Sequence, residues 1–402
     1  MQTSNRLEGI GEYYFSQKLR EIDALNKQGR NVINLGIGSP DLPPHPDVIR
    51  VLQEESAKPN VHAYQGYKGS AILRNALSDW YAKWYGVKLD PETEILPLIG
   101  SKEGIMHVCM TYLNPGDLVM VPNPGYPTYR SAAKMAGGTI VEYTLREENN
   151  WFPDFDELQR IVDAHPGAKQ RGSMAWVNYP HMPTGQLPDE TIFEKWIAFA
   201  KKNNVLVCHD NPYSFILNDK PMSILSVPGA KETALELNSL SKSQNMAGWR
   251  VGMLASGKQV VDDVLRFKSN MDSGMFLPVQ LAAAKAVSLD ESWYAKVNQT
   301  YRERRQSVFQ LLQLLNTSFS DNQAGMFVWA KIPHQYADGF AMSDEILKEA
   351  AVFITPGGIF GSAGNEFIRV SLCSPVQKFE EARERISKAF EKRGTISTSV
   401  KI

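Results

Sequence analysis

Between residues 237 and 252, a lysine, three serines and an arginine fall within one short stretch. The amine of Lys242 could form a Schiff base if it is neutral part of the time, which requires burial or a nearby cation that lowers its pKa. Arg250 could be that cation, and its guanidinium together with the hydroxyls of Ser239 and Ser241 would suit a phosphate. A reactive lysine beside a phosphate pocket suggests pyridoxal phosphate. On this stretch alone, a solvated turn with Arg250 in a surface ion pair is an equally good interpretation.

A carboxylate and a phenol follow another apolar run. Asp210 ends the run 205–208, where a carboxylate is costly unless it is paired. Beside a pyridine nitrogen, Asp210 would keep that nitrogen protonated and make the ring an electron sink. Tyr213 could donate to the phenolic oxygen of the same ring. The alternatives are a capping or turn aspartate and a half-buried packing tyrosine.

Two further segments could hold such a cofactor. Residues 100–104 lie between an apolar run and a helical pattern, so Ser101 and Lys102 would start a helix whose free N–H groups suit a phosphate. A plain helix cap by Ser101 is compatible with this interpretation. Tyr126, after the next apolar run, could stack on a flat ring, although a lone tyrosine is more often part of a core.

Arg369 lies inside the apolar run 367–370, where an unpaired guanidinium would be expensive. A substrate carboxylate would pair with it through two hydrogen bonds; a structural ion pair is the alternative. Near the other end of the chain, Gly36 and Gly38 lie in a proline-rich turn. They could relieve strain there or allow the backbone to approach a ligand, and their spacing does not decide between the two.

Composition limits the class of protein. The chain has 402 residues, 43% hydrophobic and 22% charged, with a net charge of −1. These values exclude a disordered or fibrous protein, and they give no basic patch for nucleic acid. Three isolated cysteines, Cys109, Cys208 and Cys373, predict no disulfide framework and no metal site. No signal peptide and no span of about 18 apolar residues is recognisable, so we expect a cytoplasmic protein without a membrane contact.

The order of apolar and amphipathic segments predicts the fold. From 46 to 290, seven short apolar runs alternate with helical patterns, as in a mostly parallel seven-stranded sheet flanked by helices. We expect this segment to be a large cofactor-binding domain. Residues 1–45 should form an arm and part of a small domain, and residues 291–402 a smaller C-terminal α/β domain, closed by a helix over 377–392. Because several runs end in polar residues, those ends should meet in one crevice.

Together these residues resemble the fold-type I pyridoxal-phosphate aminotransferases, the class I and II group that includes aspartate aminotransferase. The resemblance covers nearly the whole chain, and the run around Lys242 that ends in Gly-Trp-Arg-x-Gly is specific for that group. It implies the fold-type I architecture, pyridoxal 5′-phosphate as cofactor, and a homodimer with composite active sites.

The resemblance also implies roles for single residues. Lys242 looks like the Schiff-base lysine, Asp210 the partner of the ring nitrogen, and Tyr213 the donor to the phenolic oxygen. Gly38 and Arg369 match residues that contact the substrate, Arg369 through the α-carboxylate. The other expected cofactor contacts are Ser101, Lys102, Tyr126, Asn178, Ser239, Ser241, Arg250 and, from the partner subunit, Tyr64.

Two positions depart from the family pattern. Met182 stands where an asparagine normally bonds the phenolic oxygen and the substrate carboxylate, and a thioether cannot donate either bond. Tyr213 would then act alone unless Asn178 or His181 compensates, and the pKa of the linkage between cofactor and lysine should rise. Gln244 replaces a usual aromatic residue, so the packing around Lys242 is an open question.

The implied reaction is ping-pong transamination, in which the amino group of an L-amino acid passes to a 2-oxo acid, for example 2-oxoglutarate. A lyase of the same fold, which cleaves a carbon–sulfur bond or closes a ring, would need the same residues. A non-catalytic binding or regulatory protein is less favoured, because Lys242, Asp210 and Arg369 are all present. The donor's side chain would be selected near Tyr14, Ile37 and Phe360.

Overall fold

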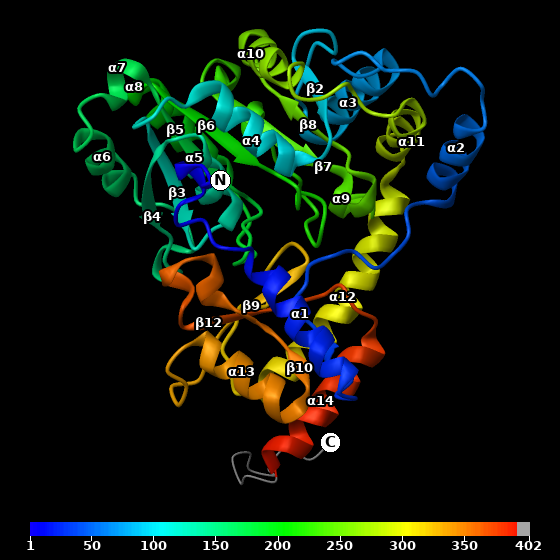
Figure 1. The fold of residues 1–402 in the computed structure, drawn as a ribbon, viewed down its shortest axis with the longest axis vertical. Coiled ribbons are helices and arrows are strands. Elements are labelled where there is room, and N and C mark those ends of the chain that lie inside the picture. Colours follow the sequence, from blue (N-terminus) through cyan, green and yellow to red (C-terminus); the bar gives the residue numbers. More distant parts are fainter. Residues whose placement is uncertain (392–402) are drawn as a thin grey trace.

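The computed structural model describes residues 1–391 as a mixed α/β protein with a seven-stranded sheet at its centre (Figure 1). Six strands run in one direction, and β8 alone is antiparallel to both of its neighbours. The predicted mostly parallel sheet is therefore confirmed. Across the sheet the strands are β2 (Ile95–Leu98), β8 (Gly252–Ala255), β7 (Ala234–Ser239), β6 (Val205–Asp210), β5 (Ser173–Val177), β3 (Leu118–Asn123) and β4 (Thr139–Thr144).

The central strands are buried on both faces, which explains why their sequences are almost continuously apolar. In β5, Met174 and Trp176 belong to one core cluster, while Ala175 and Val177 belong to the other, as the two-residue period of a strand requires. Helices cover both faces (Figure 1). One core includes residues of α4 (Ser101–Tyr112), α5 (Pro127–Met135) and α10 (Lys258–Lys268), and the other those of α3 (Ala71–Tyr85), α6 (Phe155–Asp163) and α8 (Glu190–Asn203).

A second group of elements lies below this sheet in Figure 1. The 24-residue helix α12 (Glu291–Leu314) leads into it. Ile22 of α1 packs with Leu347 and Phe353, so the N-terminal helix rests on the C-terminal elements. The group contains the antiparallel sheet β11 (Thr355–Pro356), β12 (Phe367–Ser371) and β9 (Phe327–Lys331), the parallel pair β1 (Ile33–Asn34) and β10 (Val352–Phe353), and the helices α1 (Tyr14–Lys27), α13 (Gly339–Ala350) and α14 (Val376–Glu391).

The closing helix α14 is described to Glu391, and residue 392 of the predicted helix lies outside the described residues. The helices α2 (Pro46–Ser56) and α11 (Leu277–Val287) complete the upper part of Figure 1. Helix α11 contacts both α2 and α3. Within residues 1–391, every helix is too short or too polar to span a membrane.

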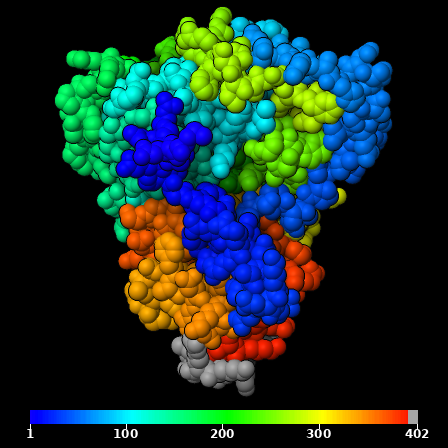
Figure 2. Space-filling view, in the orientation of Figure 1, coloured from blue at the N-terminus to red at the C-terminus, as the bar shows by residue number. Residues whose placement is uncertain are grey.

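The carboxyl ends of the parallel strands collect the polar residues singled out in the sequence. Asn178 follows β5, Asp210 ends β6, Ser239 ends β7, and Ser101 begins α4 three residues after Leu98, the last residue of β2. These ends face β9 and β12 across a cavity, and the N-terminal segment crosses the front of the molecule at that level (Figure 2). The site therefore forms between the large sheet and the C-terminal elements.

Candidate active site

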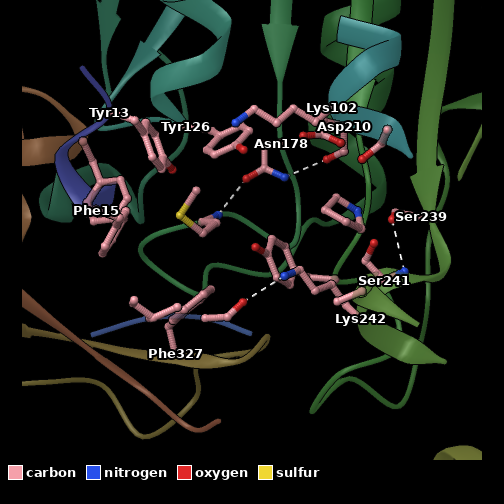
Figure 3. A pocket seen from close by; sticks show the side chains of 18 of the residues that line it. Tyr13, Phe15, Lys102, Tyr126, Asn178, Asp210, Ser239, Ser241, Lys242 and Phe327 are labelled. Carbon is pink, nitrogen blue, oxygen red and sulfur yellow. Dashed lines mark hydrogen bonds between the residues drawn. The ribbon is translucent and has the colours of Figure 1, made fainter. Parts of the chain in front are cut away.

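Lys242 lies on the short helix α9 (Leu240–Ser243), directly after β7. Its Nζ donates to the carbonyl oxygen of Gly38 at 2.9 Å (Figure 3). Burial lowers the pKa of the amine, and the cations of Arg369 and Arg250 lower it further. A Cβ atom at Gly38 would lie 2.2 Å from the ring of Phe327, so the close approach of this backbone explains the glycine. The surroundings of Lys242 therefore favour the neutral form of the amine more than water does.

Asp210 has one satisfied and one free carboxylate oxygen, both buried. Oδ2 accepts a hydrogen bond from the hydroxyl of Tyr129 at 2.8 Å, whereas Oδ1 has no partner among the described residues. Burial raises the pKa of this carboxyl to about 6. A buried oxygen without a donor is costly, and the protonated nitrogen of a pyridine ring would supply the missing hydrogen bond. Asp210 therefore fits the role predicted for it.

The N-terminus of α4 and the side chains after β7 form a cradle suited to an anion. Gly100 precedes α4 with a φ of 86° and provides no side-chain cap, so the first N–H groups of the helix stay free. The guanidinium of Arg250 packs against Gly100, where a Cβ atom would come within 2.0 Å of Nη2. Arg250 also donates to the hydroxyl of Ser241 at 3.4 Å. This donor set matches a phosphate.

Arg369 is buried, with 3% of its surface exposed, and no carboxylate pairs with it within residues 1–391. Its guanidinium carbon lies 3.8 Å from the ring centre of Phe327 and 4.7 Å from that of Phe360. Nη2 donates to the carbonyl of Gly36 at 2.9 Å, while Nε has no partner in the part of the chain that the structure describes. Burial lowers the pKa of Arg369 to about 10. A buried cation without an anion is expensive, so the site is prepared for a carboxylate.

The structure brings nearly all the predicted site residues into one cavity of about 420 Å³ (Figure 3). The residues predicted from the sequence that line it are Gly38, Ser101, Lys102, Tyr126, Asn178, Asp210, Tyr213, Ser239, Ser241, Lys242, Arg250 and Arg369. Tyr64 does not line it; this side chain is 92% exposed on the surface.

The two departures from the family pattern have defined surroundings. Met182 lines the cavity, and its backbone N–H donates to Oδ1 of Asn178 at 2.7 Å. Asn178 in turn donates to the carbonyl of Asp210 at 2.6 Å, so it ties the loop to β6. Gln244 points away from the cavity, because its side chain is buried and donates to the hydroxyl of Tyr294 at 2.8 Å. Where the family has an aromatic residue, this chain therefore has a glutamine that is hydrogen-bonded to α12.

Several residues of the site were not named from the sequence. The substrate's side chain was expected near Tyr14; Tyr14 itself packs against Phe340, and its neighbours Tyr13 and Phe15 line the cavity. Tyr129, the donor to Asp210, was also missed. Its position three residues after Tyr126 in one helical turn is the only signal that could have indicated it.

Comparison with known proteins agrees with the geometry. The family model "Aminotransferase class I and II" matches residues 30–386. The chain is 38% identical to the LL-diaminopimelate aminotransferase of Aquifex aeolicus, over 95% of this chain and 98% of that protein. It is 39% identical to the enzyme of the same name from Oleidesulfovibrio alaskensis, over 96% of this chain and 98% of that protein.

Solved structures give the same result. The substrate-bound BacF structure from Bacillus subtilis superposes with a TM-score of 0.90 at 34% identity, over 96% of this chain and 97% of that one. A double mutant of Thermus thermophilus aspartate aminotransferase, at 23% identity, shares the fold with a TM-score of 0.88 over 97% of this chain and all of that one. The chain therefore belongs to the class I and II aminotransferases, enzymes that use pyridoxal 5′-phosphate to transfer amino groups.

Proposed function

We propose that the twelve predicted residues lining the cavity hold pyridoxal 5′-phosphate and one amino or oxo acid at a time. The observation that carries this proposal is a pair of buried atoms without a partner among residues 1–391, Oδ1 of Asp210 and Nε of Arg369. The first requires a hydrogen-bond donor, and the second requires an acceptor. Asp210 would bind the cationic ring nitrogen, and Arg369 the α-carboxylate. Ser101, Lys102, Ser239, Ser241 and Arg250 would hold the phosphate, with Tyr126 against the ring and Tyr213 and Asn178 near its phenolic oxygen.

When bound, the cofactor supplies a carbonyl carbon that links to amines and a ring that accepts electrons from the substrate's α-carbon. The residues of the chain control the proton that moves. Lys242 would hold the cofactor covalently, and its Nζ, once free, would take the proton from the substrate's α-carbon. Burial lowers the pKa of this amine, which favours the neutral form that a base requires.

Arg369 fixes which carbon reacts. Two hydrogen bonds from the guanidinium to the α-carboxylate would set the orientation of the amino acid, with the rings of Phe327 and Phe360 holding the guanidinium plane. A 2-oxo acid such as 2-oxoglutarate presents the same carboxylate, so one arginine serves both halves of a ping-pong reaction.

We propose further that the active protein is a homodimer with composite sites, in the cytoplasm. A face formed by residues 62–72 and 271–276 exposes large apolar side chains, and the ring of His62 stacks on Phe276 at 5.6 Å. The exposed fractions are 92% for Tyr64, 47% for Tyr67, 61% for Ile72, 53% for Met271 and 41% for Phe276. Such a patch is typical of an interface, and Tyr64 would reach the phosphate of the partner. The three cysteines are unpaired, which suits a reducing compartment.

Borohydride reduction of the purified holoenzyme, followed by peptide mass spectrometry, tests the central assignment. The cofactor mass should be found on the peptide that contains Lys242, and Lys242→Ala should remove both this label and turnover. Lys258→Ala is the matched control, because Lys258 forms only a surface ion pair with Asp262. A label on another lysine would refute the assignment. Release of ammonia or pyruvate without an oxo acid would instead indicate a lyase.

A further inference from the structure

The outer part of the cavity, beyond Lys242 and Arg369, has apolar walls. Tyr13, Phe15 and Leu19 reach it from the N-terminal helix and the residue before it. The remaining walls are Ile37 from the turn after β1, Phe327 from β9 and Phe360 near β12. Figure 3 shows Tyr13 and Phe15 on the side of the cavity away from Ser239 and Ser241, where the phosphate would lie. The substrate's side chain would extend toward these rings.

Most of the charged side chains that line the cavity already have a role in the proposed function. Among the described residues, Asp210 is the only acidic side chain that lines it, and the proposed function assigns that carboxylate to the ring nitrogen. Four cations line it, and the proposed function uses the side chains of Lys242, Arg250 and Arg369. For the fourth, Lys102, that function uses only the backbone N–H at the start of α4, so its ammonium group has no assigned role. Its Nζ lies 4.9 Å from the ring centre of Tyr13, and no carboxylate within residues 1–391 forms an ion pair with it.

We propose that the amino donor carries a large apolar side chain, aromatic or branched aliphatic, and no second ammonium group. This inference rests on the proposed function and narrows its substrate. A donor such as LL-diaminopimelate ends in an ammonium and a carboxylate, and in this cavity the distal ammonium would find no acidic acceptor and would lie near the cation of Lys102. An ammonium without an acceptor loses hydration that the walls of this cavity do not replace, whereas an apolar side chain gains by burial against these rings.

The proposed partner subunit does not supply the missing acid through its Tyr64 segment. Residues 59–70, which would reach the neighbouring site, contain no aspartate or glutamate. Their charged side chain is Lys68, and its Nζ donates to the carbonyl of Glu92 at 2.7 Å. The segment would therefore add an aromatic ring, Tyr64, and amide groups to the site, but no acceptor for a second ammonium.

A donor panel assayed with the holoenzyme and 2-oxoglutarate tests the inference. We expect kcat/KM for L-phenylalanine and L-leucine to exceed that for LL-diaminopimelate by about 10- to 200-fold, the discrimination typical of an apolar pocket. A preference for LL-diaminopimelate would overturn the inference. A preference for L-aspartate would overturn it as well, and would assign Lys102 to a distal carboxylate.

A binding experiment separates this inference from the proposed transfer reaction, because it needs no turnover. We expect 3-phenylpropionate to bind the holoenzyme more tightly than glutarate, measured by calorimetry. If 3-phenylpropionate binds better but no donor is converted, the apolar pocket stands and the transfer reaction fails. If donors are converted but glutarate binds better, the transfer reaction stands and the apolar pocket fails.

One substitution should change the specificity in a defined direction. Ser16 lies on α1 among the apolar wall residues and is exposed at the mouth of the cavity. Ser16→Asp would give a distal ammonium the acceptor it lacks. We expect at least a tenfold increase in the ratio of kcat/KM for LL-diaminopimelate to that for L-phenylalanine, with Ser16→Asn as the uncharged control. An unchanged ratio in a folded Ser16→Asp enzyme would contradict the proposed position of the substrate's side chain.

Discussion

Arg369 donates through Nη1 to the sulfur of Met182, at a distance of 3.3 Å. A thioether accepts weak hydrogen bonds and donates none, so Met182 helps to hold the free arginine but cannot bond a phenolic oxygen. His181 does not compensate, since its Nδ1 lies 2.8 Å from the hydroxyl of Thr184 and its ring does not line the cavity. Tyr213 and Asn178 are the hydroxyl and amide that remain near the expected ring.

The first prediction concerns the proton that the proposed function places between the Lys242 nitrogen and the cofactor's phenolic oxygen. Met182→Asn should restore a donor to that oxygen and stabilise its anion, which lowers the pKa of the linkage by about one unit. Titration of the visible absorbance of the holoenzyme with pH measures this value. Met182→Leu, which removes the sulfur without adding a donor, should leave it unchanged. The explanation fails if the two variants titrate alike.

The second prediction concerns the pH dependence of cofactor binding. The pKa of Asp210 is raised to about 6 by burial, so in the protein without cofactor this carboxyl is protonated below that pH. Because a cationic ring nitrogen favours the ionised form, affinity for the cofactor should fall as pH drops below about 6, by at most roughly tenfold per unit, and level off above it. Equilibrium titrations between pH 5 and 7.5 measure the effect. In Asp210→Asn this dependence should vanish and the affinity should be lower throughout.

The third prediction concerns Arg369. Arg369→Met should weaken transition-state binding by about 2–4 kcal/mol, or roughly 30- to 1,000-fold in kcat/KM, because a substrate carboxylate would lose a charge-assisted bidentate partner. Arg369→Lys should recover part of the loss, since a lysine keeps the positive charge but cannot form the two parallel hydrogen bonds of a guanidinium. Arg302→Met removes a surface ion pair with Asp219 and serves as the control. Equal effects of Arg369→Met and Arg302→Met would argue against a carboxylate at this position.

Sequence alone predicted the sheet and the residues at its carboxyl edge, because apolar runs mark buried strands and parallel strands place their ends together. It could not predict that Phe327 and Phe360 enclose Arg369, since these residues lie on separate segments that meet only in the folded chain. It also left the roles of Gly36 and Gly38 undecided. The structure shows close backbone approach at both, because a Cβ atom would lie 2.3 Å from the ring of Phe353 at Gly36 and 2.2 Å from the ring of Phe327 at Gly38. Their carbonyls accept from Arg369 and Lys242 respectively.

The fourth prediction concerns stability. Glu236 is fully buried next to the strand that carries Asp210, and it accepts from Tyr81 at 2.9 Å and Ser223 at 2.5 Å. Its Oε2 also lies 3.0 Å from Nδ1 of His209. Glu236→Gln would place amide hydrogens against existing donors and should destabilise the fold by about 3–5 kcal/mol, seen as a Tm lower by several degrees. Glu232→Gln, at an exposed pair with Lys201, should change the Tm little. Equal melting temperatures for both variants would refute this account.

The fifth prediction tests whether Tyr64 of one subunit completes the site that contains Lys242 of the other. Lys242→Ala removes the nucleophile, and Tyr64→Ala should weaken cofactor binding, because Tyr64 is 92% exposed and free to reach a partner. If the two residues serve one site from different subunits, a dimer with one copy of each variant contains one intact site and one doubly defective site. Mixing the two variants under conditions of subunit exchange should then restore roughly a quarter of the wild-type activity. If instead each site were built from one subunit only, each site of the mixed dimer would carry one defect. Activity would then never exceed the average of the two parent variants.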